Sequence, residues 1–114
     1  MADPIVHIEI LAEDLAQSSK FYSQLFGWQM SPWSDSYMMF EAGSGPGGAL
    51  MSAPEHRQPV LPYIQVADID AVLTAAQSAG GTVLAPKRQI SPEIGYSAML
   101  ADPQGNKVGL FSKQ

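Results

Sequence analysis

Two side chains able to exchange protons, His7 and Glu9, lie two residues apart near the start of the chain. The segment Ile5–Leu11 around them is rich in β-branched residues, which favours a strand. Because side chains alternate between the two faces of a strand, His7, Glu9 and Leu11 share one face. Imidazole and carboxylate groups are the usual acid and base catalysts of proteins. Glu9 is therefore a candidate proton-transfer base, with His7 as its hydrogen-bond partner.

The residues after this strand follow the pattern of a helix. Asp14 is a suitable N-cap, since its carboxylate can accept amide hydrogens of the first turn. Apolar residues then recur at helical spacing as far as Gly27, a residue type that often ends helices in the left-handed conformation. A helix is predicted over about residues 14–26.

The second half of the chain repeats this pattern. An extended segment, Leu61–Val66, precedes a second capping residue, Asp68, and a helical segment that ends before Gly80–Gly81. The offset is constant, because Asp68 follows Asp14 and Gly81 follows Gly27 by the same 54 residues. An internal duplication is the economical explanation.

Short extended segments broken by turn residues follow each predicted helix. There are three in each half: Trp28–Met30, Tyr37–Ala42 and Gly48–Ser52, then Thr82–Ala85, Tyr96–Ala101 and Lys107–Ser112. Asp102–Asn106 has the composition of a turn between the last two. The chain is thus predicted to be α+β, with two β-α-β-β-β modules over about residues 1–54 and 55–114 in a single domain.

Composition excludes several classes of function. The chain has no cysteine, which rules out disulfides, zinc–cysteine sites and thiol nucleophiles. The net charge is −5 with no basic run, which argues against nucleic acid and anionic membranes as partners. Gly43–Gly48 lacks the Lys-Ser/Thr pair of a phosphate-binding loop, so a hairpin connection is predicted there. Without a leader pattern or a long apolar run, a cytoplasmic location is expected.

Three groups of residues carry a resemblance to a known family. They are His7-Ile8-Glu9-Ile10 with Asp14, Phe21-Tyr22-x-x-Leu25-Phe26-Gly27-Trp28, and Asp102-Pro103-Gln104-Gly105-Asn106 before Val108-Gly109-Leu110-Phe111. Along essentially its whole length the chain resembles the vicinal oxygen chelate superfamily of glyoxalase I, bleomycin resistance proteins and extradiol dioxygenases. The resemblance implies tandem modules forming a curved, barrel-like mixed sheet with a small-molecule site in a central cleft, often in a homodimer.

The metal-dependent members of that superfamily bind a divalent cation with one ligand from the first strand and one from the last strand of each module. His7 matches the first of these positions. The others match Leu61, Gly109 and either Gly48 or Ala49, none of which can coordinate a metal. The resemblance therefore implies loss of the usual metal site, and no cofactor is expected. An unorthodox site stays open, with candidate ligands His7, Glu9, Glu41, Glu55 and His56.

The repeat also suggests which side chains face the implied cleft. The 54-residue offset places Tyr63 and Gln65 at the positions equivalent to Glu9 and Leu11. Polar residues on a buried strand face need partners. A ligand-binding set and an internal network without a ligand are both consistent with them. The predicted binding residues are the polar group His7, Glu9, Tyr63 and Gln65, with the aromatic residues Trp33, Tyr96 and Phe111.

These observations favour a metal-independent protein that binds a small molecule in the cleft, similar to the bleomycin resistance branch. The acidic composition favours a cationic or neutral ligand over an anionic one. Two alternatives remain. One is a glyoxalase-type lyase or isomerase with Glu9 and His7 as acid-base groups, and the other is a non-catalytic accessory domain for a protein partner.

Overall fold

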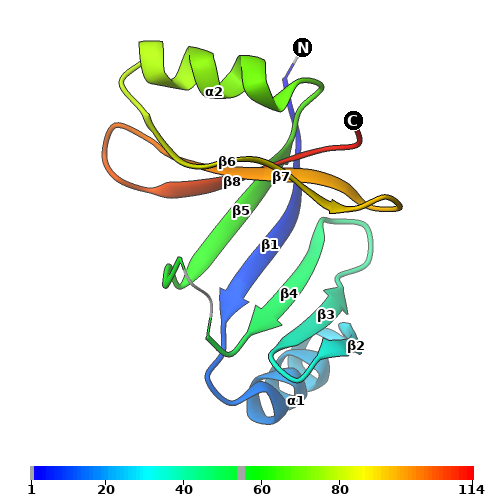
Figure 1. Cartoon of the computed structure of the whole chain (residues 1–114). Helices are drawn as coiled ribbons and strands as arrows, with labels where there is room; N and C mark the ends of the chain where they lie inside the picture. The colour runs from blue at the N-terminus through cyan, green and yellow to red at the C-terminus, as the bar shows by residue number, and fades with distance from the viewer. Residues whose placement is uncertain (1, 54–55) are drawn as a thin grey trace. The chain divides into compact units, whose positions relative to one another are not determined.

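Each half of the chain folds as one strand, one helix and three further strands (Figure 1). The computed structural model describes residues 2–53 and 56–114. The predicted α+β class and the two β-α-β-β-β modules are confirmed. The elements are β1 (Ile5–Leu11), α1 (Leu15–Phe26), β2 (Gln29–Ser34), β3 (Tyr37–Glu41), β4 (Gly47–Met51), β5 (Val60–Gln65), α2 (Ile69–Ser78), β6 (Thr82–Ser91), β7 (Gly95–Ala101) and β8 (Lys107–Ser112).

The chain divides into two compact units, each with its own strands and helix. The first unit is Val6–Pro62, and the second unit is Met1–Ile5 with Tyr63–Gln114. In the first unit the strand order is β2-β3-β4-β1, and only β1 and β4 run parallel. In the second unit the order is β5-β8-β7-β6, and only β5 and β8 run parallel. The two units thus share one topology.

The core of the first unit lies between α1 and one face of its sheet. Leu50 of β4 is fully buried and Phe40 of β3 is nearly so. The Trp28 ring stacks on Phe40 with ring centroids 4.3 Å apart, and Tyr22 of α1 stacks on Trp28 at 5.0 Å. Because side chains alternate along β1, the face that bears His7 is the one turned away from α1.

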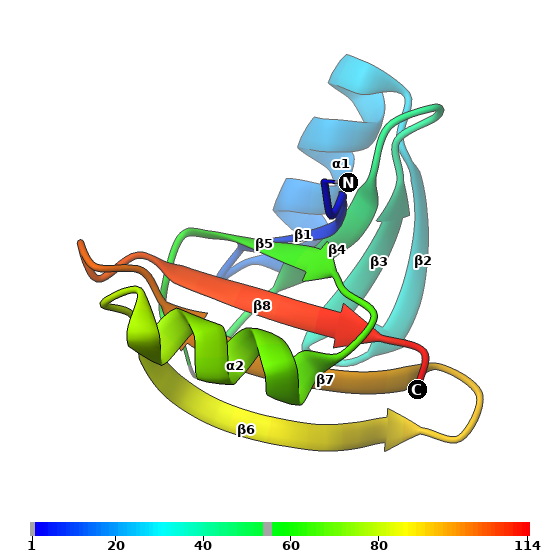
Figure 2. The ribbon, with the colours of Figure 1, turned by 90° about the horizontal axis from the view of Figure 1, so that it is seen from above.

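The core of the second unit has the same construction. Ile69 and Leu73 of α2 are buried against Ala98 of β7 and Leu110 of β8. Figure 2 shows α2 running along the sheet of this unit. Each sheet therefore has one face covered by its helix and one face turned away from it, and the second is called here the open face.

Both helices begin as predicted, because each has its capping aspartate. Asp14 Oδ1 accepts a hydrogen bond from Gln17 N at 3.0 Å, and Asp68 Oδ1 accepts one from Ala71 N at 3.1 Å. The helix ends are less alike. Gly27 is left-handed with φ of 73°, whereas after α2 the positive φ, 96°, belongs to Gly80. The equivalence of Gly27 with Gly81 is therefore wrong, because α2 is shorter and its chain turns one residue earlier.

Two strands are longer than their sequence patterns predicted. β6 continues from Thr82 to Ser91 through Pro86, and β2 runs from Gln29 to Ser34 through Pro32. Proline donates no amide hydrogen, so it is rare inside a strand that pairs on both sides. Within its unit each of these strands pairs on one side only, where a missing donor is tolerated.

Candidate functional site

Glu9 is a buried carboxylate in the middle of β1. It is 6% exposed and lies on the open face of the first unit, opposite the Ala49 position of β4. Ala49 is fully buried and contributes only a methyl group beside it. A buried charge is costly unless hydrogen bonds compensate it, so the partners of Glu9 decide what this position can do.

The first partner of Glu9 is Tyr37, at the start of β3. Its hydroxyl group donates a hydrogen bond to Glu9 Oε2 at 3.0 Å. His7 Nε2 lies 2.9 Å from the same Tyr37 oxygen. Since the single hydroxyl hydrogen points to Glu9, Nε2 of His7 is the protonated nitrogen and donates to Tyr37. In this hydrogen-bonded chain, His7 therefore donates to Tyr37 and Tyr37 donates to Glu9.

The second partner is His56, in the connection between β4 and β5. Its Nδ1 accepts a hydrogen bond from Gln58 N at 3.0 Å, which leaves the proton on Nε2. That Nε2 lies 3.3 Å from Glu9 Oε1, and the His56 and Glu9 side chains are 5% and 8% exposed. A protonated nitrogen or hydroxyl group therefore lies beside each oxygen of the carboxylate.

The electrostatics of His7 agree with this arrangement. Burial lowers the pKa of His7 below its ordinary 6.5, and the negative charge of Glu9, whose Oε2 lies 3.9 Å from His7 Nε2, partly opposes the shift. His7 is therefore neutral at neutral pH, and it can relay a hydrogen bond without adding a positive charge to the site.

The structure brings together part of the predicted set in the first unit. His7 and Glu9 share the open face, whereas Trp33 of β2 is 66% exposed. Tyr37 is not one of the predicted binding residues, and His56 is predicted only as a candidate ligand of the unorthodox metal site. The sequence shows only that Tyr37 starts a predicted strand. It does not show the strand register that brings Tyr37 to Glu9, a residue 28 positions away.

In the second unit, alternation and register place Tyr63, Gln65 and Phe111 on the open face. Tyr96 does not join them. It packs with the core under α2, and the Lys87 ammonium group lies 4.7 Å from the centre of its ring. The expectation that Tyr96 lines the same face as Gln65 is wrong, because Tyr96 aligns with Ser112 and alternates with Ser97, the partner of Phe111.

The four positions that the family resemblance assigns to a metal do not fit one. Tyr63 aligns with Gly109 as Glu9 aligns with Ala49, so the first-module counterpart of Gly109 is Ala49. Ala49 and Leu61 are fully buried apolar side chains. A Cβ atom at Gly109 would lie 2.5 Å from the Tyr63 ring, so the ring occupies the space of a ligand there. His7 is the one donor among the four.

The unorthodox metal site is not supported by the part of the chain that the structure describes. Within residues 2–53 and 56–114, no group of three or more His, Asp or Glu side chains is placed to hold a metal ion. Glu55, one of its candidate ligands, lies outside the described residues. In the same ranges, neither helix is long and apolar enough to cross a membrane.

Comparison with known proteins identifies relatives along most of the chain. The family model described as "Glyoxalase-like domain" matches residues 6–111. Two curated relatives, from Mycobacterium bovis and Mycobacterium tuberculosis, both carry the name "Putative glyoxylase CFP32" and are 30% identical over 91% of this chain. The match spans 43% of the length of each relative, so more than half of each relative lies outside it.

Solved structures show the same fold at low identity. A glyoxalase/bleomycin resistance protein/dioxygenase superfamily member from Vibrio splendidus 12B01 superposes with a TM-score of 0.75 and 14% identity, covering 97% of this chain and 99% of that one. The Mn(II)-bound glyoxalase from Novosphingobium aromaticivorans superposes with a TM-score of 0.70 and 17% identity, covering 97% of this chain and 38% of that one.

Proposed function

Since the chain belongs to the glyoxalase-like domain family, we propose that it binds a small molecule on the open face of the first unit, around Glu9 and His7. The observation that carries this proposal is the buried Glu9 carboxylate with Tyr37 on one oxygen and His56 beside the other. Small-molecule sites commonly have a few fixed polar groups on an otherwise apolar surface. Here Met39 of β3, which aligns with the buried Ala49 of β4, is partly exposed and supplies apolar surface on the same face.

The proposed binding does not use a metal at the positions of the metal-dependent relatives. Leu61, Ala49 and Gly109 offer no donor atoms, and divalent metals need several protein donors at once. The ligand would instead be held by hydrogen bonds and by the charge of Glu9. A cationic or hydrogen-bond-donating molecule matches that chemistry best.

A second candidate function follows from the hydrogen-bonded chain. His7, Tyr37 and Glu9 are joined at 2.9 Å and 3.0 Å, a connection along which a proton can be redistributed. This supports a lyase or isomerase of glyoxalase type in which Glu9 exchanges a proton with a bound substrate and His7 serves as the second acid-base group. The predicted homodimer and cytoplasmic location stay predictions from the sequence, for light scattering and cell fractionation to test.

A thermal-shift screen of neutral and cationic small molecules tests the binding proposal on chelator-treated protein. A ligand present at about 100 times its Kd adds about 2.7 kcal/mol to the free energy of unfolding. We expect Glu9→Gln to weaken the best hit by roughly 1.5–3 kcal/mol, the range for a hydrogen bond to a charged group. We expect His7→Ala to weaken it as well, whereas Glu13→Gln, at an exposed position, serves as the matched control.

Three outcomes would contradict the proposal. If Glu9→Gln and His7→Ala leave the affinity unchanged in folded protein, the site is wrong. If no compound binds, an accessory role for a protein partner is favoured instead. If elemental analysis of protein purified without chelator finds one divalent metal per chain, bound through His7, metal independence is wrong. If the protein converts a hit to product and Glu9→Gln loses this activity, the lyase or isomerase function is favoured over binding alone.

A further inference from the structure

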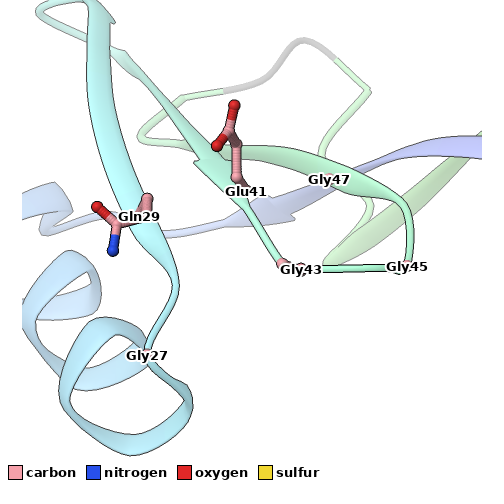
Figure 3. A pocket seen from close by; sticks show the side chains of 7 residues that line it. Gly27, Gln29, Glu41, Gly43, Gly45 and Gly47 are labelled. Carbon is pink, nitrogen blue, oxygen red and sulfur yellow. The ribbon is translucent and has the colours of Figure 1, made fainter.

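A depression of about 510 Å³ lies in the first unit, beside the end of β3, the start of β4 and the start of β2 (Figure 3). Small-molecule sites usually have volumes of roughly 300–1,000 Å³, so the size is suitable for a ligand or for one end of it. The residues that line it are Gly27, Gln29, Glu41, Ala42, Gly43, Gly45 and Gly47.

The depression is hollow because most of its wall is glycine backbone. Gly27 and Gly43 have φ values of 73° and 76°, which side chains rarely allow. At Gly47 a Cβ atom would lie 2.7 Å from the Phe40 carbonyl oxygen. The backbone therefore requires these three glycines. Gly45 differs, since its φ is not in that range and nothing lies within 4 Å of an added Cβ.

Two polar side chains, Gln29 and Glu41, come from aligned positions on β2 and β3 (Figure 3). The Glu41 side chain is exposed and makes no hydrogen bond or ion pair with another residue in the described part of the chain. By sequence, Val6–Pro62 contains six acidic residues and two basic residues, Lys20 and Arg57. Glu41 therefore brings one negative charge to the depression, and no side chain of the described residues neutralises it by an ion pair.

The depression adjoins the proposed site around Glu9. Gly47 is the direct cross-strand partner of His7, and a Cβ atom at Gly47 would lie 3.8 Å from the Glu41 Cα atom. Side-chain alternation places Glu41 on the same open face as His7. Neighbouring strands are about 4.8 Å apart, so His7 and Glu41, two strands apart, are separated by roughly 10 Å.

We propose that this depression is a binding subsite for a planar cationic group, an amidinium or guanidinium, on a small molecule. Such a group offers paired N–H donors that match the two oxygens of the Glu41 carboxylate, and the Gln29 amide oxygen can accept a further hydrogen bond. The glycines of the wall carry no side chains and leave space for such a group. This inference goes beyond the proposed function and does not depend on Glu9.

The test compares benzamidine with benzamide, a neutral molecule of nearly the same shape, by calorimetric and NMR titration at low ionic strength. We expect benzamidine to bind and benzamide to bind at least about tenfold more weakly. A tenfold difference in Kd is near the low end of what a hydrogen bond to a charged group contributes. Glu41→Gln should weaken benzamidine by about tenfold as well. The matched control Glu13→Gln should change its affinity by less than about twofold.

A second variant tests the location without changing charge. Gly45→Tyr places a bulky side chain at the one glycine of the wall that tolerates a side chain. It should abolish benzamidine binding, whereas Gly45→Ala should retain it. Thermal melts of each variant confirm that it is folded. Equal binding of benzamide, retained affinity in Glu41→Gln or Gly45→Tyr, or no binding of benzamidine would each overturn the proposal. Loss of benzamidine binding in Glu9→Gln but not in Glu41→Gln would assign the cation to Glu9.

Discussion

The first strands of the two units, β1 and β5, occupy equivalent positions and carry different chemistry. On β1 the open face presents His7 and Glu9, and on β5 the equivalent position to Glu9 is Tyr63. The residue aligned with this position on the neighbouring strand is larger in the first unit than in the second. Glu9 lies beside Ala49, whereas the larger Tyr63 ring lies over Gly109, with no space for a Cβ atom.

This difference shows which features the repeat retains. The capping aspartates, the parallel strand pair and the apolar residues under each helix are alike in both units. The open faces have diverged, one to a buried hydrogen-bonded carboxylate and the other to an aromatic ring packed on glycine. The scaffold thus tolerates large changes on the open face, because the other face supplies the core.

The largest expected effect tests whether the helix-covered faces are equivalent. Leu50 aligns with Ile10 in the first unit as Leu110 aligns with Ile64 in the second, and the two leucines are 0% and 2% exposed. We expect Leu50→Ala and Leu110→Ala each to lower the free energy of unfolding by about 2–5 kcal/mol, measured by denaturant titration. A loss below about 1 kcal/mol in one of them would show that the two cores are not comparable.

An intermediate effect is expected at Gly109. Gly109→Ala forces a methyl group into the Tyr63 ring and should cost roughly 1–3 kcal/mol in the free energy of unfolding. In a Tyr63→Ala background the same change should cost much less, because the ring is no longer there. A double-mutant cycle measures this coupling. Equal costs in both backgrounds would show that the backbone, rather than the ring, requires glycine.

Features encoded by neighbouring residues could be predicted from the sequence. The strand around His7, the capping aspartates and the turn at Asp102–Asn106 depend on local spacing and composition. In the turn, Asp102 Oδ1 accepts hydrogen bonds from Gln104 N and Asn106 N, both at 2.9 Å, and Asn106 bonds are the main reason that the pKa of Asp102 is lowered. Each of these features needs only a few residues.

Features that depend on strand register could not be predicted in the same way. Tyr37 reaches Glu9 only because β3 pairs with β4 and β4 with β1. His56 reaches it through a connection whose path no local pattern specifies. The same reason applies to β6, whose length follows from its pairing with β7 rather than from the proline within it.

A smaller effect is expected from the helix caps, which are the most similar features of the two units. Asp14→Ala and Asp68→Ala each remove one side-chain hydrogen bond to a first-turn amide. Each should cost about 1 kcal/mol in the free energy of unfolding. Asp14→Asn and Asp68→Asn keep an accepting oxygen and should recover most of the loss. Failure of asparagine to rescue either helix would show that charge, rather than the hydrogen bond, is what the cap supplies.

The smallest effect is expected from the titration of His7, because burial and the charge of Glu9 shift the pKa of His7 in opposite directions. Burial lowers the pKa of His7 below 6.5, and Glu9 partly restores it. The unfolded chain therefore takes up this proton at a higher pH than the folded protein does. As the pH falls through 6.5 towards the folded pKa, the free energy of unfolding should decrease, and above 6.5 this contribution should be constant.

Glu9→Gln sharpens this expectation, because it removes the charge that raises the pKa of His7. The pKa of His7 should then fall further, so the loss of stability with acid should continue to lower pH in the variant. NMR titration of the His7 ring protons gives the two pKa values directly, and denaturant titrations between about pH 7.5 and about pH 5.5 give the stability. His7→Asn should remove this part of the pH dependence. A His7 pKa that rises in Glu9→Gln would contradict the geometry, since it would mean that the two groups do not interact as their 3.9 Å separation requires.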